Sequence, residues 1–164
     1  MQNRNDIIRG LLTHGDYQAL AELRHGIREF LHFSEEASRA AGLEPRQHQF
    51  MLALKGLPAE IRPRIAELAE RLKIQHHSAV ELVNRLSRGG FVRRHRGKED
   101  KREVLLSLTP KGEKILRELS LHHRTELQMR GPALVAALRH AMQPGQIAKS
   151  VEGAVQSKKT GKAC

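Results

Sequence analysis

Hydrophobic residues recur at three- and four-residue steps along most of the chain, which is the spacing of amphipathic helices. The first stripe predicts a helix over about 16–41, with Asp16 as its N-cap and Gly42 as its C-terminal stop. A second helix, opened by a proline, is predicted over 45–55. The apolar residues of the first stripe are Leu20, Leu23, Ile27, Phe30 and Leu31.

The middle of the chain changes from helical to strand periodicity. Two short helices are predicted over 65–72 and 76–88, separated by a turn, and Gly89–Gly90 stops the second. Residues 91–96 and 103–109 are β-branched or alternating runs, joined by the polar sequence GKEDKR. This pattern predicts a β-hairpin with a charged tip.

The last third of the chain again favours helices. Thr109 followed by Pro110 is a typical helix start, so we expect a helix over about 110–129. Gly131–Pro132 is expected to break it and to leave a last short helix over 133–142. From residue 144 onward the chain is small, polar and lysine-bearing, which predicts a loosely held basic tail.

Length and composition limit the possible classes of protein. The chain has 164 residues, about one domain, and can bury a core without disulfides. Apolar residues make up 39% and charged residues 29%, and no stretch approaches the roughly 20 apolar residues of a membrane span, which favours a soluble, cytoplasmic protein. The single cysteine, Cys164, excludes an internal disulfide. We find no motif for nucleotide phosphates or for a catalytic nucleophile, so we expect neither an enzyme nor a cofactor.

Positive charge is concentrated in the middle of the chain. The formal net charge is +11, which favours a polyanionic partner. Residues 55–102 contain 13 basic and 6 acidic side chains, whereas residues 1–54 contain 6 and 7. Within 93–102, six basic residues accompany two acidic ones. The positive field is therefore centred near the predicted hairpin.

A helix, a turn, a second helix and a basic hairpin predict a winged helix-turn-helix, a mainly α fold with a small β-hairpin wing. In this fold the second helix enters the major groove of DNA, and the hairpin tip reaches a minor groove whose negative potential attracts arginine. A solvated basic hairpin is the alternative, and the preceding helix-turn-helix favours DNA binding. The residues expected to contact DNA from the second helix are Gln75, His76, His77, Ser78, Glu81 and Arg85. Glu81 either accepts from a cytosine amine or holds Arg85 in place.

Three segments resemble the multiple antibiotic resistance regulator (MarR) family. They are IAELAERL at 65–72, LVNRLSRGGFVRR at 82–94 and EDKREVLLSLTPKG at 99–112. The resemblance covers roughly 45–120. It implies a homodimeric transcriptional regulator in which a small ligand, bound between the dimer helices and the DNA-binding lobe, lowers DNA affinity.

The resemblance also assigns roles to residues of the hairpin. By position, Arg102 is the arginine that enters the minor groove, and Asp100 orients it through a charge-assisted hydrogen bond. Arg94, Arg96 and Lys98 are expected to contact phosphates around it.

Four segments follow from the pattern and the resemblance together. We expect an N-terminal dimerisation region over 1–44, a DNA-binding lobe over 45–109, C-terminal dimerisation helices over 110–143 and a basic tail over 144–164. The apolar stripes outside the lobe must bury their faces against each other and a partner chain. The expected dimer contacts are Leu20, Leu23, Ile27, Leu119 and Leu127.

The ten histidines raise the question of a metal site, but their spacing argues against one. His76–His77 and His122–His123 are adjacent pairs, and neighbouring side chains on a helix point in different directions. We therefore expect no metal site, and we expect His123 to be a satisfied interface histidine.

The function that these observations favour is a homodimeric repressor that binds a pseudo-palindromic double-stranded DNA operator and is released by a small-molecule effector. Two alternatives remain open from the sequence. One is a non-specific architectural DNA-binding protein. The other is a protein-interaction module whose basic face meets an acidic partner.

Overall fold

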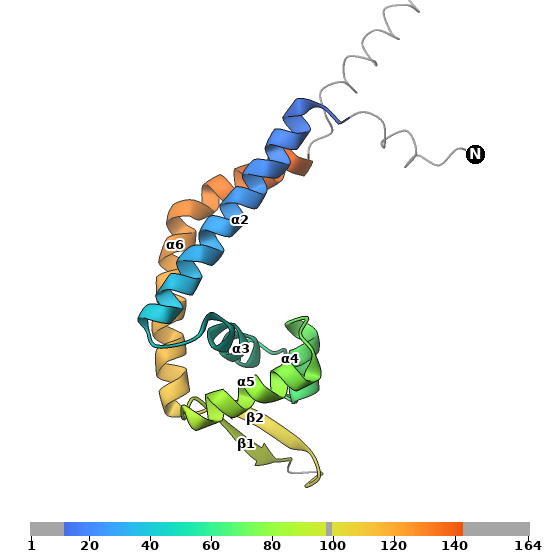
Figure 1. Cartoon of the computed structure of the whole chain (residues 1–164), viewed down its shortest axis with the longest axis vertical. Coiled ribbons are helices and arrows are strands. Elements are labelled where there is room, and N and C mark those ends of the chain that lie inside the picture. Colours follow the sequence, from blue (N-terminus) through green and yellow to red (C-terminus); the bar gives the residue numbers. More distant parts are fainter. Residues whose placement is uncertain (1–11, 98–99, 143–164) are drawn as a thin grey trace, which may run out of the picture. The chain divides into compact units, whose positions relative to one another are not determined.

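The computed structural model of the chain describes residues 12–97 and 100–142. Its order of elements confirms the mainly helical winged-helix class (Figure 1). The elements are α2 (His14–Ala40), α3 (Pro45–Lys55), α4 (Ile65–Arg71), α5 (His76–Arg88), β1 (Val92–Arg96), β2 (Val104–Leu108) and α6 (Pro110–Met142). Among these residues, no helix combines the length and apolar character needed to cross a membrane.

The chain divides into two compact units. We call residues 31–126 the winged-helix unit, and the described residues 12–30 and 127–142 the terminal-helix unit. The long helices α2 and α6 contribute residues to both units.

The core of the winged-helix unit lies between α3, α4, α5, the hairpin and the start of α6. Phe50 and Met51 of α3 and Val83 of α5 are fully buried in it. This core also takes in the first turns of α6. Leu119, an expected dimer contact, is only 4% exposed and packs in this core of its own chain. The other buried members are Leu43, Leu54, Leu68, Leu82, Leu86, Val92, Leu106, Leu108 and Leu116.

In the terminal-helix unit, α6 continues through Pro132, so the predicted break at Gly131–Pro132 is wrong. Proline removes one backbone donor from the helix, and α6 contacts α2 on both sides of it. Before it, Arg130 forms an ion pair with Glu29 of α2 at 3.3 Å. After it, Leu134 packs so close to Gly26 of α2 that a Cβ there would lie 3.2 Å from its Cδ1.

The start of α2 also differs from the prediction. The helix begins at His14, and Asp16 lies inside its first turn. The Thr13 hydroxyl accepts a hydrogen bond from the Asp16 N–H at 3.2 Å, and the Asp16 carboxylate accepts from the Thr13 N–H at 2.7 Å. The carboxylate also accepts from the Thr13 hydroxyl at 2.8 Å, and the two bonds that it accepts, the backbone one first, lower the pKa of Asp16. Thr13 is therefore the cap and Asp16 its reciprocal partner, as in a capping box. At the other end, Gly42 has the positive φ (78°) of a helix stop, as predicted.

The hairpin and α6 meet at a close backbone contact. The Thr109 N–H donates to the Phe91 carbonyl at 3.0 Å, and the Thr109 hydroxyl accepts from the Gly112 N–H at 3.0 Å, which confirms Thr109 as the helix cap. Gly112 lies so near β1 that a Cβ on it would be 2.1 Å from the Phe91 carbonyl oxygen. Lys111 lies across the junction, where its ammonium donates to the Gly89 carbonyl at 2.8 Å and sits 4.4 Å from the Phe91 ring centre.

Gly112→Ala is expected to destabilise the chain by at least about 3 kcal/mol, because the new methyl group overlaps a backbone oxygen that cannot move without shifting β1. Gly131→Ala is the control, since a Cβ there meets nothing within 4 Å in the same helix. Chemical denaturation should give Gly131→Ala a free energy of unfolding within about 1 kcal/mol of that of wild type. Equal stability of the two variants would contradict the close contact.

Two histidines lie in the winged-helix core. His48 of α3 is 2% exposed, and its ring centre is 4.8 Å from that of His123 of α6, which Phe33 contacts edge-on at 6.0 Å. Neither ring nitrogen of His48 has a hydrogen-bond partner among the described residues. Burial, with a smaller effect from His123, lowers the pKa of His48 to about 4, and burial also lowers the pKa of His123. His123 is thus a core residue of its own chain.

This pair predicts loss of stability in mild acid. An unfolded histidine takes up a proton near its ordinary pKa of 6.5, whereas folded His48 stays neutral until about pH 4. The free energy of unfolding should therefore fall between these values, by up to about 3 kcal/mol from His48 alone. His48→Leu should reduce this fall and raise stability at pH 7 by about 1 kcal/mol, because two unpaired nitrogens leave the core. Denaturation from pH 7 to pH 4 tests it, with His32→Leu, at an exposed position of α2, as the control. An unchanged pH profile in His48→Leu would refute this account.

Candidate nucleic-acid interface

The helix-turn-helix presents the start of α5 to solvent. Lys73, with φ 54°, turns the chain after α4, and the Ile74 N–H closes the turn on the Ala69 carbonyl at 3.0 Å. The first turn of α5 follows, where Ala79 is fully buried while His76 and His77 are exposed, as is Gln75 just before them. Packing on one side therefore leaves these three polar side chains directed outward.

The other predicted α5 residues lie along a different side of the helix. Ser78, Glu81 and Arg85 line a polar cavity of about 370 Å³ formed with the end of α2 and the start of α3. Ser78 is half-buried, while Glu81 and Arg85 are exposed. Within the described part of the chain, no ion pair joins Glu81 to Arg85, so the structure does not show Glu81 holding Arg85.

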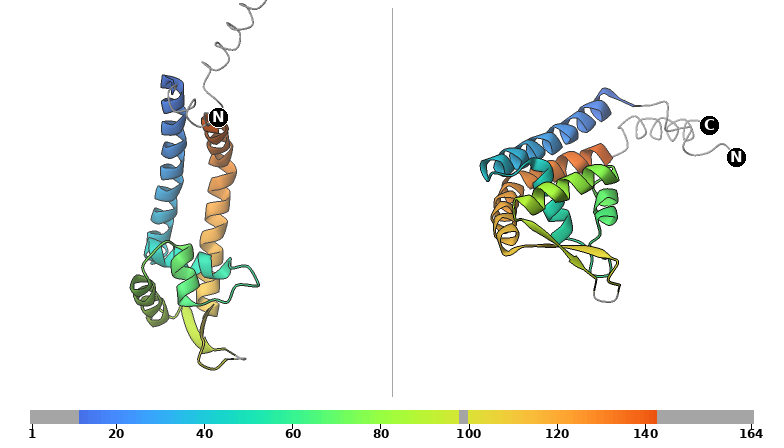
Figure 2. Two further views of the ribbon diagram at one scale, coloured as in Figure 1. Left: turned by 90° about the vertical axis from the view of Figure 1, so that its right-hand side faces the viewer. Right: turned by 60° about the horizontal axis from the view of Figure 1, so that its bottom comes forward.

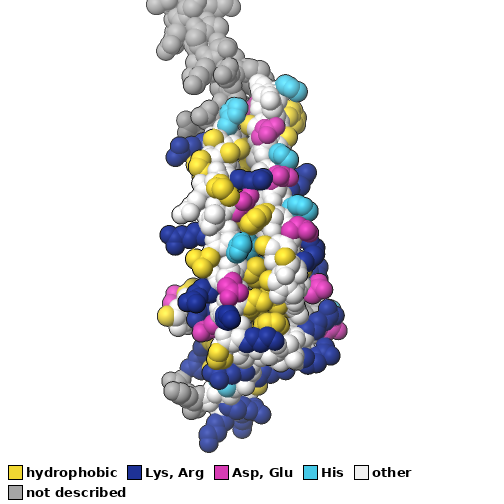
Figure 3. Space-filling model, turned by 90° about the vertical axis from the view of Figure 1, so that its left-hand side faces the viewer, with side chains coloured by type: hydrophobic (Ala, Val, Ile, Leu, Met, Phe, Trp, Pro, Cys, Tyr) yellow, Lys and Arg dark blue, Asp and Glu magenta, His cyan; other side chains and the backbone are white. Residues whose placement is uncertain are grey.

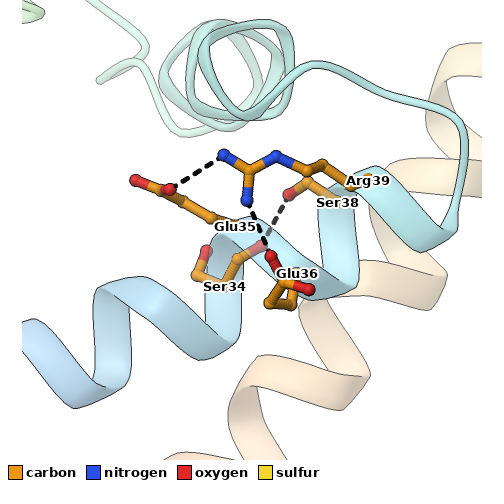
Figure 4. Close-up of polar contacts among 5 residues, drawn as sticks. All are labelled: Ser34, Glu35, Glu36, Ser38 and Arg39. Carbon is orange, nitrogen blue, oxygen red and sulfur yellow. Dashed lines mark hydrogen bonds and ion pairs between the residues drawn. The ribbon is translucent and has the colours of Figure 1, made fainter.

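Charged side chains also line the α2 side of this cavity. Arg39 lies between Glu35 and Glu36 near the end of α2 and pairs with them at 3.1 and 2.9 Å (Figure 4). These interactions raise the pKa of the Arg39 guanidinium above its ordinary value, with the hydrogen bond to Glu35 as the largest cause. The Ser38 hydroxyl, fully buried beside it, donates to the Ser34 carbonyl at 2.7 Å. Glu35, Arg39, Glu44 and Arg46 thus give this cavity both signs of charge.

The wing, by which we mean residues 92–108, packs next to α5 (Figure 2). Its strands pair antiparallel, with Arg94 opposite Leu106 and Arg96 opposite Val104. Directly paired residues share a face of the hairpin, so Arg94 lies on the face whose Leu106 enters the core. Its guanidinium donates to the Asn84 side-chain oxygen of α5 at 2.7 Å. This hydrogen bond ties the wing to the candidate recognition helix.

At the wing tip, Asp100 orients the backbone of its neighbour. Its carboxylate accepts a hydrogen bond from the Arg102 N–H at 2.8 Å, which is a local turn contact and differs from the expected bond to the guanidinium. Arg102 and Arg96 are exposed, and Arg96 donates to the Lys101 carbonyl at 3.2 Å. Lys98 lies outside the described residues.

The structure adds residues to the site that sequence reasoning missed. Glu103, whose side chain is only 10% exposed, pairs with Arg62 at 2.7 Å and Arg64 at 3.5 Å in the connector before α4. Arg62, Arg64, His76 and Arg102 line a common open cleft of about 640 Å³. No sequence signal could have found these pairs, because the partners are some forty residues apart and only folding brings them together.

Basic side chains gather around the wing in the winged-helix unit, at the lower end of the view in Figure 3. Arg93, Arg94, Arg96 and Arg102 are all exposed. Among residues 12–97 and 100–142, no group of three or more histidine, cysteine, aspartate or glutamate side chains is arranged to hold a metal ion. The geometry instead suits an anionic surface that contacts the start of α5 and the wing together.

Apolar side chains of the terminal-helix unit remain at the surface. Leu20, Ile27 and Leu127 are 44%, 42% and 44% exposed, and Leu23 is half-buried. Among the described residues of this unit, Ala19 is the one hydrophobic residue that is fully buried. The further exposed members are Leu12, Tyr17, Met129, Val135, Leu138 and Met142.

Comparisons with known proteins connect this geometry to a family. The family model described as the MarR family matches residues 41–103. An uncharacterized HTH-type transcriptional regulator of Bacillus subtilis (strain 168), YfiV, is 34% identical over 56 residues, which are 34% of this chain and 35% of that protein. This alignment spans about a third of the curated relative. The resemblance predicted from the three sequence segments is confirmed.

Solved structures agree on the fold. The MarR family transcriptional regulator AbsC of Streptomyces coelicolor is similar at a TM-score of 0.64 and 22% identity, over 87% of this chain and 98% of that one. The MarR family transcription regulator SP03579 is similar at a TM-score of 0.64 and 20% identity, over 87% of this chain and 92% of that one. A single-residue mutant of S. aureus MepR, bound to an oligodeoxyribonucleotide, is similar at a TM-score of 0.55 and 14% identity, over 92% of this chain and 98% of that one.

Proposed function

We propose that this chain, whose residues 41–103 match the MarR family, is a transcriptional regulator of that family that binds double-stranded DNA in a sequence-dependent way. The observation that carries the proposal is the hydrogen bond between Arg94 of the wing and Asn84, which joins a basic hairpin to the same helix, α5, whose first turn is exposed. An α-helix fits the major groove, and a basic hairpin beside it reaches the adjacent backbone and minor groove. MepR, a structural neighbour, binds an oligodeoxyribonucleotide.

In this proposal the two elements have different tasks. Gln75, His76 and His77 reach base edges, because they are exposed at the N-terminal end of α5. Arg94, Arg96 and Lys98 contact phosphates, and Arg102 enters the minor groove. Ser78, Glu81 and Arg85 lie on the cavity side of α5 and act at the edge of the interface.

We further propose a homodimer on a pseudo-palindromic operator. The apolar side chains of the terminal-helix unit support it, because one chain leaves them exposed in water. A two-fold dimer presents two α5 helices, and half-sites one turn apart set their separation near 34–36 Å.

Repression relieved by a small molecule is the regulation we propose. The cavity beside Ser78 and Glu81 touches α5 itself, so a bound compound can shift the helix that reads DNA. The charges of the cavity favour a polar effector.

Competition binding with genomic fragments tests the function. Sequence-selective binding by the full chain supports the proposal. Salt-sensitive binding without selectivity would indicate an architectural DNA-binding protein, and the absence of DNA binding would indicate a module for an acidic protein partner.

Arg102→Ala should flatten the salt dependence of DNA affinity. Each phosphate or groove contact releases counterions and contributes about 0.9 to the log–log slope, so two copies in a dimer contribute about two units. Folding should be unaffected, because Arg102 is exposed. Arg139→Ala, an exposed arginine in α6, is the control and should leave the slope unchanged. DNA titrations between about 50 and 200 mM salt measure the slope for each variant. Equal slopes for Arg102→Ala and Arg139→Ala would contradict the wing assignment.

Sedimentation should show a dimer at micromolar concentration. Ile27→Glu should convert it to a monomer, because a carboxylate would be buried in an apolar interface without a partner. Leu52→Glu is the matched control, since Leu52 of α3 is similarly exposed, at 48%, but lies in the winged-helix unit. A monomeric wild type, or the same result for both variants, would refute the proposed interface.

A further inference from the structure

Glu103 occupies an unusual place for a carboxylate near a candidate DNA surface. It immediately follows Arg102, yet its side chain is only 10% exposed. Its Oε2 accepts a hydrogen bond from Arg62 at 2.7 Å, and its Oε1 lies 3.5 Å from Arg64. Both arginines belong to the connector before α4, so this carboxylate joins the far half of the wing to the helix-turn-helix.

The wing has no apolar anchor near its tip in the described residues. Val92, Leu106 and Leu108 bury the base of the hairpin, whereas Arg96 and Val104 beyond them are exposed. A two-stranded hairpin is marginally stable by itself, so the position of its tip depends on contacts with the rest of the unit. The Leu106 N–H donates to the Pro63 carbonyl at 2.9 Å, and the Glu103 ion pairs extend this attachment toward the tip.

Backbone contacts transmit the attachment to the tip itself. The Gly97 N–H donates to the Glu103 carbonyl at 3.0 Å, and the Glu103 N–H donates to the Asp100 carbonyl at 3.1 Å. Gly97 is buried, and a Cβ on it would lie 3.0 Å from the Glu103 carboxylate. Fixing Glu103 therefore fixes both sides of the turn that carries Arg102.

We infer that Glu103, held by Arg62 and Arg64, is a positioning residue for DNA specificity. This inference rests on the proposed DNA-binding function. Glu103 sets where Arg102 lies relative to the start of α5, so that one duplex meets both in register. The open cleft lined by Arg62, Arg64, His76 and Arg102, together with Asp100 and Glu103, lies between these elements, and there we place the DNA backbone.

The inference predicts opposite effects on two kinds of binding. In Glu103→Gln, removal of a negative charge leaves affinity for a scrambled duplex equal or higher, since only phosphate attraction matters there. Affinity for the operator falls, because Arg102 and α5 no longer engage their grooves together. We expect the ratio of operator to scrambled affinity to drop about tenfold, the discrimination of one good base contact.

The experiment measures both affinities for wild type and variants of the full chain. Glu113→Gln is the matched control, because it removes the same charge and breaks an exposed ion pair, with Lys55 at 2.6 Å, in the same unit. The ratio of operator to scrambled affinity of Glu113→Gln should stay within about twofold of that of wild type. Arg62→Gln breaks the Glu103 ion pair from an exposed position, and should lower the ratio even if Glu103→Gln fails to fold.

Two results would overturn the inference. One is a ratio within about twofold of wild type in both Glu103→Gln and Arg62→Gln. The other is a parallel loss of operator and scrambled affinity, which indicates a merely structural role. Failure of the proposed function looks different, because wild type itself would then not distinguish operator from scrambled DNA.

Discussion

The close approach of Gly112 to the Phe91 carbonyl is the constraint on which the winged-helix unit depends. At this point the second strand ends, α6 is capped by Thr109, and the backbone of β1 fixes where the helix starts. From there Leu116 and Leu119 reach the same core as the helix-turn-helix. A side chain at position 112 would push apart the hairpin and the helix, and with them the two sides of that core.

The two acidic residues described in the wing, Asp100 and Glu103, make contacts within the fold, and its described arginines are exposed. Asp100 shapes the turn through a backbone N–H, and Glu103 is neutralised by two arginines of the connector. A polyanion approaching the wing meets arginine side chains beside the exposed Asp100, whereas the Glu103 carboxylate is paired within the unit. The winged-helix unit also holds a histidine pair in its core, where burial lowers the pKa of both rings. Position in the fold, rather than residue type, decides which titratable groups present charge.

Local signals made much of the fold predictable, and tertiary contacts account for what was missed. Helices α3 and α5, the hairpin and the Thr109 cap follow from periodicity, turns and capping, which act over a few residues. The continuity of α6 through Pro132 involves contacts with α2, which lies far away in the sequence. Leu119 is buried because the core extends past the lobe predicted over 45–109. In the candidate site, the exposed start of α5 and the basic wing were predictable. The Asn84–Arg94 bond and the Glu103 pairs join residues distant in sequence, so no pattern could indicate them.

Lys111 shows that the net charge of a chain and the charge that a ligand meets are different quantities. Its ammonium donates to the Gly89 carbonyl and lies over the Phe91 ring, so it is already engaged within the protein. The electrophoretic mobility of the protein depends on its net charge, which includes this cation with all the others. A surface lying against the wing meets that charge at a fixed place, because the side chain is bound to the Gly89 carbonyl of its own backbone. A chain with the same residues in another order would have the same isoelectric point and a similar electrophoretic mobility. It would nevertheless present a different pattern of charge to a ligand.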